Sequence, residues 1–247
     1  MVPKLLSIVI PAYNEEPFLG TLLQRIQAVD LAALGVAKEI IVIDDCSRDR
    51  TADVARGVPG VIVERHQKNG GKSAAVRTGI RKATGDFLII QDADLEYEPQ
   101  DYIPMLNALL SGRGDIVYGS RYLGRGLVGG KQRQQSWGAY LGGRSLSLVA
   151  LVCTGHYVTD TVTALKLFPR NVLLSLDLRT TGFELDHEIT AKVLARGYRI
   201  VEVPIRYVPR SRQEGKKIGM RDWFVATRTF WKYRRTGKEE LGGVRKS

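Results

Sequence analysis

Five short runs of β-branched and other apolar residues alternate with amphipathic helical patterns in the first half of the chain. The predicted strands are Leu6–Ile10, Glu39–Ile43, Val61–Val63, Phe87–Ile90 and Asp115–Tyr118, and the predicted helices between them are Phe18–Val29, Thr51–Ala55, Ser73–Ala83 and Gln100–Leu110. Runs that are apolar at nearly every position are typical of strands that helices cover on both faces. The alternation therefore predicts an α/β fold with a wound, mostly parallel sheet and flanking helices.

Polar residues follow four of these predicted strands. They are Pro11 to Glu15 after the first strand, Asp44 and Asp45 after the second, Asp92 to Asp94 after the fourth and Gly119 to Arg121 after the fifth. In wound parallel sheets, ligands bind in a crevice outside the carboxyl ends of the strands. We therefore expect these four segments to meet at one binding site.

The second half of the chain is less regular. Its patterns predict a helix pair or one bent helix over Gln132–Val152, a strand over Thr163–Phe168, a helix over Asp186–Ala195, a strand over Arg199–Arg206 and a last helix over Asp222–Arg235. That last helix carries aromatic residues among arginines and lysines. We expect one domain over residues 1–220, followed by a basic amphipathic helix and tail over residues 221–247.

The chain of 247 residues carries a formal net charge of +11, which attracts acidic partners such as a nucleotide, a nucleic acid or an anionic membrane. Its two cysteines, Cys46 and Cys153, form no zinc or disulfide motif, which fits a reducing cytoplasm. The most apolar segment, Leu146–Cys153, is much shorter than the roughly 20 residues of a membrane-spanning helix. We therefore expect a cytoplasmic globular protein with an acidic partner.

Three carboxylates stand at alternate positions directly after the fourth predicted strand: Asp92, Asp94 and Glu96. In an extended conformation they share one face, and their mutual repulsion requires a cation or water between them. Mg²⁺ or Mn²⁺ accepts a small number of carboxylate ligands and leaves room for the oxygens of a pyrophosphate. The alternative interpretation is a solvated acidic turn before a helix that begins near Pro99.

The segment Asn69–Ser73 resembles the end of a phosphate-binding loop, but His66 stands where that motif requires a glycine. We therefore reject a loop of that kind and predict a helix start, which can still approach an anion. Asp44 or Asp45 either caps the turn that follows or accepts a base N–H from uracil or guanine.

Two further polar segments allow more than one interpretation. The basic segment Pro209–Met220 is either a solvated charge run or a loop that closes over phosphates. The pair His187 and Glu188 lacks the HExxH spacing of a zinc site, so we expect it to lie at the surface or to pack in the core.

Six motifs together resemble the inverting glycosyltransferase family 2, which has the GT-A fold. They are IVIPAYNEE, EIIVIDDCSRDRT, NGGKSAAVRTGIRKATGD, QDADLEYEP, YGSRY and VEVPIRYVPR, and the resemblance covers about Leu6 to Lys217. Within that family the chain is similar to the dolichyl-phosphate mannose synthase-like group, which moves a sugar from a nucleotide to a polyprenyl phosphate. The resemblance implies a Rossmann-like GT-A fold, a UDP- or GDP-sugar donor, Mg²⁺ or Mn²⁺ as cofactor, and dolichyl or undecaprenyl phosphate as acceptor.

The resemblance also implies a role for each matching residue. The residues implied to hold the nucleoside are Pro11, Tyr13, Glu15, Ile43 and Asp45, with Asp92 and Ala93 near the ribose. Asp94 and Glu96 are implied to hold the metal, Asp94 also lying against the nucleotide.

Basic residues are implied for the phosphates or the acceptor. They are Arg121, Arg210 and Lys216. The chain departs from the group at Asp160–Lys166, where relatives commonly have an aspartate followed by a Thr-Gly-aromatic-Arg pattern.

The expected reaction is an in-line displacement at the anomeric carbon, with inversion of configuration and stabilisation of the leaving nucleoside diphosphate by the metal and basic residues. A lipid phosphate acceptor is already anionic and needs little or no general base. A hydroxyl acceptor needs one, and Asp186 or Glu184 is the candidate. The alternative interpretation is that both acids stand at the N-terminus of a helix, where negative charge is favourable.

Other functions fit the sequence less well. A family 2 enzyme acting on a hydroxyl of a glycan is the main alternative, and a non-enzymatic basic membrane protein that uses the aromatic last helix is another. We expect no nucleic acid partner, because no RNA-recognition motif is present. A sugar-1-phosphate nucleotidyltransferase typically begins with a glycine- and arginine-rich loop instead of Pro11-Ala12-Tyr13. We therefore expect an enzyme peripheral at an anionic membrane surface, with a membrane protein subunit as an open option.

Overall fold

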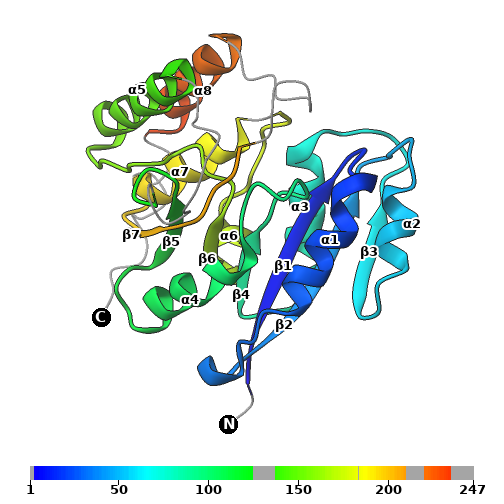
Figure 1. The fold of residues 1–247 in the computed structure, drawn as a ribbon. Coiled ribbons are helices and arrows are strands. Elements are labelled where there is room, and N and C mark those ends of the chain that lie inside the picture. Colours follow the sequence, from blue (N-terminus) through cyan, green and yellow to red (C-terminus); the bar gives the residue numbers. More distant parts are fainter. Residues whose placement is uncertain (1–2, 125–136, 183, 210–219, 235–247) are drawn as a thin grey trace.

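The described part of the chain, residues 3–124, 137–182, 184–209 and 220–234 of a computed structural model, forms a sheet between layers of helices (Figure 1). Its seven strands lie in the order β3-β2-β1-β4-β6-β5-β7. They are β1 (Lys4–Ala12), β2 (Val36–Asp44), β3 (Val61–Arg65), β4 (Phe87–Ile90), β5 (Ile116–Ser120), β6 (Lys166–Pro169) and β7 (Ile200–Pro204). Neighbouring strands are parallel except where β6 pairs with β4 and β5. The predicted mostly parallel α/β sheet is confirmed.

The helices also follow the prediction closely. They are α1 (Glu16–Gln27), α2 (Thr51–Arg56), α3 (Lys72–Lys82), α4 (Tyr102–Leu110), α5 (Trp137–Thr154), α6 (Arg170–Ser175), α7 (Leu185–Ala195) and α8 (Met220–Tyr233), with 3-10 turns η1 (Ala32–Leu34) and η2 (Pro99–Asp101). The predicted helix over Gln132–Val152 is described from Trp137 onward, where it is one continuous helix. Helix α6 is absent from the prediction.

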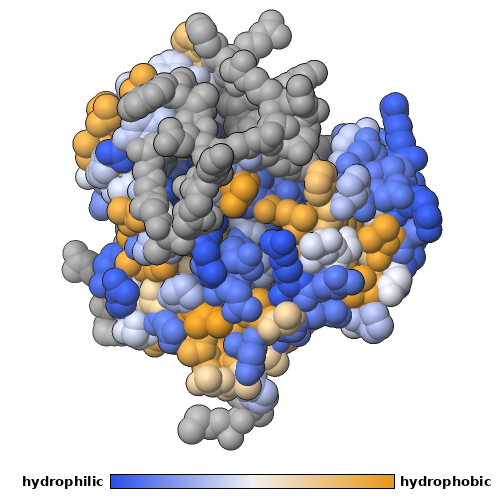
Figure 2. Space-filling model, in the orientation of Figure 1, coloured by the Kyte–Doolittle hydropathy of each residue, from blue (hydrophilic) through white to orange (hydrophobic). Residues whose placement is uncertain are grey.

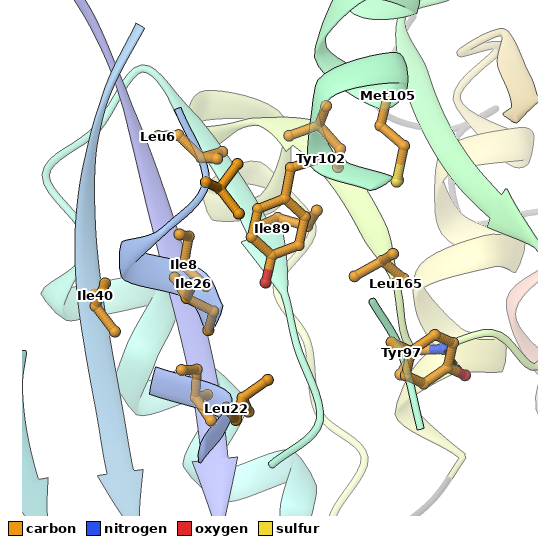
Figure 3. Packing of buried hydrophobic residues seen from close by; sticks show 14 of the residues in the cluster. Leu6, Ile8, Leu22, Ile26, Ile40, Ile89, Tyr97, Tyr102, Met105 and Leu165 are labelled. Carbon is orange, nitrogen blue, oxygen red and sulfur yellow. Dashed lines mark hydrogen bonds between the residues drawn. The ribbon is translucent and has the colours of Figure 1, made fainter. Parts of the chain in front are cut away.

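Side chains alternate between the two faces of the central strands, and both faces are buried. On β1, Leu6 and Ile8 join the cluster that contains α1 and α4, whereas Val9 joins the cluster on the opposite face, with α3 and α7. Figure 3 shows the first cluster, in which Leu22 and Ile26 of α1 lie against the sheet. This two-sided burial explains why the strands are apolar at nearly every position.

Helix α3 packs very close to β1. A Cβ atom added at Gly79 would lie 2.2 Å from Cγ1 of Val9, well inside van der Waals contact. A glycine at this position therefore permits the close approach that brings α3 against β1 and β2.

Helices α5, α7 and α8 form a further packed group beside the sheet. Phe230 and Tyr233 of α8 are buried with Ala150 of α5 and Ala191 of α7. Figure 1 shows α5 and α8 side by side above α7. None of the described helices is long and apolar enough to cross a membrane. The division of the chain between residues 220 and 221 stays a prediction.

The pair His187 and Glu188 lies in the core, as one of the two sequence interpretations expected. The His187 ring packs against Phe230 with 5.4 Å between ring centroids, and its Nδ1 atom has no hydrogen-bond partner among the described residues. Burial lowers the pKa of His187 to about 4, although Asp186 and Glu184 attract the charged form. The α7–α8 interface therefore holds a neutral histidine at neutral pH.

This histidine predicts acid sensitivity of the α7–α8 interface. Between pH 6.5 and pH 4 the unfolded chain protonates this residue and the folded chain does not, so the free energy of unfolding falls as pH falls. The expected loss from this residue is about 3 kcal/mol, complete below pH 4. Urea unfolding across this range should show a smaller decrease for His187→Gln than for the parent. Equal decreases in both proteins would contradict the assignment.

Candidate active site

The loops after β1 and β2 are tied to each other at the carboxyl edge of the sheet. Ala12 pairs with Asp44, so both strands end at the same level. The N–H of Asn14 donates to Oγ of Ser47 at 2.9 Å, and the N–H of Glu15 donates to Oγ1 of Thr51 at 2.8 Å. These hydrogen bonds hold the two loops in one arrangement before any ligand binds.

The residues predicted to hold a nucleoside differ in how accessible they are. The side chains of Pro11, Ile43 and Ala93 are buried, so their contacts with a nucleoside would come from the backbone. Tyr13 is 41% exposed, which leaves ring surface on which a base can stack. Glu15 is half-buried beside it.

Asp45 anchors the glycine turn that begins α3. Its Oδ1 atom lies 2.7 Å from Nδ1 of His66 and accepts the N–H of Gly70 at 2.9 Å, and its Oδ2 atom accepts the N–H of Gly71 at 2.6 Å. Its side chain is almost fully buried. The predicted contact of Asp45 with a base stays a prediction, and this carboxylate already holds the neighbouring loop in place.

The segment from Asp92 to Glu96 is a turn, so the expected extended conformation is wrong. Leu95 has φ of 59°, a left-handed conformation that costs a leucine on the order of 1 kcal/mol. Oδ1 of Asp94 accepts the N–H of Glu96 at 3.2 Å, and Oε2 of Glu96 accepts the hydroxyl of Tyr207 at 2.6 Å. The turn thus joins the two predicted metal ligands through a local hydrogen bond. Strained backbone of this kind is concentrated at functional sites.

Asp92 forms an ion pair that sequence reasoning missed. Its Oδ1 atom lies 2.6 Å from Nζ of Lys72, the first residue of α3. Burial disfavours the charge on Lys72, but the attraction of Asp92 and Asp186 outweighs burial and raises the pKa of the lysine. This pair joins the glycine turn held by Asp45 to the acidic turn after β4.

The carboxylates of the acidic turn fit Mg²⁺ or Mn²⁺ as a site completed by substrate. Within the residues that the structure describes, no group of three or more His, Cys, Asp and Glu side chains could hold a metal ion alone. Mg²⁺ commonly binds through one or two carboxylates together with substrate phosphates and water. The hard oxygens of Asp94 and Glu96 match that donor set, and their role as metal ligands stays a prediction.

Arg121 follows β5 and is held by a buried aspartate. Its Nε and Nη2 atoms donate to the two carboxylate oxygens of Asp160 at 2.7 and 2.8 Å, and its backbone N–H donates at 3.0 Å. The guanidinium lies over the ring of Tyr207, 5.0 Å from the centroid. Its Nη1 atom makes no hydrogen bond within the described residues, and the side chain is 10% exposed. The predicted role of Arg121 in binding an anion stays a prediction.

Asp186 lies in the first turn of α7 and pairs with a lysine from β6. Its Oδ1 atom is 2.5 Å from Nζ of Lys166, whose side chain is completely buried. Burial disfavours the charge on Asp186, but Lys166 and Lys72 outweigh burial and lower the pKa of the carboxyl. Asp186 therefore stays ionised at neutral pH and is a weak proton acceptor.

The predicted basic residues Arg210 and Lys216, and most of the predicted phosphate-closing loop Pro209–Met220, lie outside the described residues. Sequence reasoning also missed Lys72, Lys166 and the role of Asp160. The ion pair of Lys166 could have been predicted from its position inside the apolar stretch Ala164–Pro169, because a lysine is almost never fully buried unless it is paired.

Comparison with known proteins identifies the family. Residues 7–172 match the profile described as glycosyl transferase family 2. The chain belongs to this family. The chain is also 33% identical over 223 residues to a dolichol-phosphate mannosyltransferase of Pyrococcus furiosus. The match covers 86% of this chain and 59% of that protein, so the chain spans well under two thirds of this relative.

Another relative of this family 2 glycosyltransferase matches over most of its own length. It is the UDP-N-acetylglucosamine–dolichyl-phosphate N-acetylglucosaminyltransferase of Methanococcus voltae, 26% identical over 230 residues, with 84% of this chain and 87% of that protein covered.

Solved structures confirm the GT-A fold of this glycosyltransferase. The glucosyl-3-phosphoglycerate synthase of Mycobacterium tuberculosis, crystallised with Mn²⁺, UDP and phosphoglyceric acid, matches with a TM-score of 0.67 at 19% identity, covering 99% of this chain and 80% of that one. A mannosyltransferase of Pyrobaculum calidifontis in complex with GDP-Man and Mn²⁺ matches with a TM-score of 0.61 at 21% identity. The match covers 100% of this chain and 66% of that one. At these identities the likeness shows the fold alone.

Proposed function

We propose that this glycosyltransferase moves a sugar from a UDP- or GDP-sugar to a polyprenyl phosphate, with inversion of configuration and with the help of a divalent metal. The names of two relatives, which act on dolichol or dolichyl phosphate, support this acceptor class. The observation that carries the proposal is the ion pair between Asp186 and Lys166.

The ion pair bears on the acceptor because it weakens Asp186, one of the two candidate general bases. A hydroxyl acceptor must lose its proton as it attacks, so its enzyme needs a carboxylate that can take up that proton. Lys166 and Lys72 lower the pKa of Asp186, which makes the carboxylate a poor base. A phosphate acceptor attacks as an anion and does not need this step.

The donor half of the site binds and orients the nucleotide. Tyr13, whose ring is exposed, would stack on the base, and Asp45, which anchors the glycine turn, follows the neighbouring strand β2. Asp94 and Glu96 would hold Mg²⁺ or Mn²⁺, which when bound neutralises negative charge on the leaving nucleoside diphosphate. Lys72 holds Asp92 in place and adds positive charge at the same edge of the sheet.

The acceptor half binds the attacking phosphate. Asp160 fixes the plane of the Arg121 guanidinium and leaves Nη1 for a phosphate oxygen. Arg210 and Lys216 are the further cations proposed for the phosphates. A polyprenyl phosphate resides in a bilayer, so we also propose that the enzyme works at an anionic membrane surface facing the cytoplasm.

Replacing Asp186 tests the acceptor class. Asp186→Asn is expected to keep at least about a tenth of the parent rate of transfer to polyprenyl phosphate, because no proton is taken up there. A general base contributes about a hundredfold to ten-thousandfold, so a loss of that size would make Asp186 the base and favour a hydroxyl acceptor. Glu184→Gln is the matched control for the other candidate base.

A second variant separates catalysis from folding. Asp186→Asn leaves the ammonium of Lys166 buried without its carboxylate, which destabilises the protein. The double variant Lys166→Met/Asp186→Asn removes that charge and should unfold at a higher urea concentration than Asp186→Asn. If both variants are stable and both lose activity a hundredfold, the polyprenyl phosphate proposal fails.

A further inference from the structure

Helix α5 exposes an apolar ridge. Leu141, Leu148 and Val152 are 61%, 56% and 82% exposed. They are seven and four residues apart, so they lie on one face of the helix, opposite the buried Ser147 and Ala150. A solvent-facing ridge normally carries polar residues, and this one presents three large apolar side chains.

Helix α8 exposes a second apolar ridge. Phe224 and Trp231 are 61% and 59% exposed and seven residues apart, so they lie on one face of the helix. Ala226, Phe230 and Tyr233 are buried on the opposite face. The Phe230 side chain is therefore part of the core and not of the exposed ridge.

The two helices that carry these ridges lie next to each other. Nε1 of Trp223 on α8 donates to Oγ of Ser145 on α5 at 2.8 Å, and the buried sides of both helices share one cluster. The apolar residues point away from that cluster, and Figure 2 shows hydrophobic surface along the upper left edge, over α5. We call this surface the α5–α8 apolar face; its residues are Leu141, Leu148, Val152, Phe224 and Trp231.

Cations border this face. Arg228 and Lys232 of α8 line a groove of about 250 Å³ that also contains the acidic Glu184, and the guanidinium of Arg234 stacks on Trp231 at 3.5 Å from the ring centroid. Helix α5 contains no acidic residue. The net charge of +11 adds to this attraction for anionic headgroups. A second copy fits this face poorly, because pairing two such faces brings like charges together.

The face also adjoins the acceptor half of the site. Tyr122, the neighbour of Arg121, packs under α5 with its ring 5.5 Å from that of Tyr140. A Cβ atom at Gly143 would lie 2.0 Å from the Tyr122 hydroxyl, so α5 rests directly on this residue. Arg144 of α5 lies over the same ring.

We propose that the α5–α8 apolar face docks on a bilayer that contains anionic lipids and thereby sets Arg121 beside the membrane. Apolar side chains enter the headgroup region, and the bordering cations bind lipid phosphates. The evidence for docking is the exposure of the apolar side chains and the positive charge that borders them. The delivery of a membrane-borne acceptor to Arg121 rests on the proposed function.

The test compares vesicle binding of two matched double variants. Leu148→Ser/Val152→Ser changes the face, and Leu110→Ser/Leu174→Ser changes two leucines on α4 and α6 that are 37% and 46% exposed. With vesicles of phosphatidylcholine and phosphatidylglycerol, the first variant should bind at least about tenfold more weakly than the parent, and the control like the parent. Equal binding by both double variants would overturn the proposal.

Charge and oligomeric state are tested separately. Arg228→Gln/Lys232→Gln should weaken binding to vesicles with phosphatidylglycerol more than binding to pure phosphatidylcholine, as should added salt. If light scattering shows a parent dimer that Leu148→Ser/Val152→Ser converts to a monomer, the face is an interface between copies and the proposal is wrong.

Activity separates docking from the proposed function. The variant Leu148→Ser/Val152→Ser should transfer sugar to a short-chain, water-soluble prenyl phosphate like the parent, and lose transfer only to a polyprenyl phosphate in vesicles. If the parent uses neither acceptor but the variant loses vesicle binding, the acceptor assignment fails and the docking face stands.

Discussion

Asp94→Asn is expected to reduce sugar transfer by roughly a hundredfold to a thousandfold while the free energy of unfolding changes little. The amide keeps the size of the side chain and its acceptor for the N–H of Glu96, but removes the negative charge that holds a divalent cation. Chelation by EDTA should reduce the activity of the parent to a similar extent. Initial rates with Mn²⁺ and with EDTA measure both effects.

Metal-dependent nucleotide binding gives a readout of Asp94 that does not depend on turnover. A nucleoside diphosphate should raise the melting temperature of the parent more with Mn²⁺ than with EDTA, and Asp94→Asn should lose that difference. Asp53→Asn is the matched control, since Asp53 is an exposed carboxylate on α2. Full activity of the parent in EDTA would contradict the role of Asp94.

Arg121→Met is expected to lower the free energy of unfolding by about 3 to 5 kcal/mol, because it leaves the fully buried carboxylate of Asp160 without its guanidinium partner. The double variant Arg121→Met/Asp160→Asn also removes the unpaired buried carboxylate, so it should recover part of the lost free energy of unfolding. Both variants should use the acceptor poorly. Urea unfolding and the KM for acceptor measure the two effects independently.

An exposed ion pair is the control for Arg121. Arg56→Met breaks the pair between Arg56 and Asp53, whose side chains are 52% and 65% exposed, and should change stability little. If Arg121→Met is no more destabilising than Arg56→Met, the buried pair does not position Arg121 as described.

The sequence predicted the central strands well because both sheet faces are buried. The expected strand over Phe87–Ile90 has the observed bounds of β4, and all four of its residues are buried. The antiparallel course of β6 was not predictable, because an apolar run does not record its direction. The same limit applies to its place between β4 and β5.

The strand-end residues of the site were predictable, but the ion pairs that hold them were not. Tyr13 and Asp94 do lie beyond strand ends, as the wound sheet requires. Lys166 reaches Asp186 from β6, which runs antiparallel beside β5 and places Lys166 opposite Tyr118. The left-handed turn at Leu95 could not be predicted from the sequence either, because leucine disfavours positive φ.

The most direct test is the identity of the product. The enzyme should be incubated with radiolabelled UDP- and GDP-sugars, Mn²⁺ or Mg²⁺, and polyprenyl phosphate in vesicles. We expect label in an organic-extractable product that mild acid releases, as for a glycosyl phosphate, with the anomeric configuration inverted relative to the donor. Label found only in a water-soluble glycoside or polysaccharide, and none in the lipid fraction, would contradict transfer to a polyprenyl phosphate.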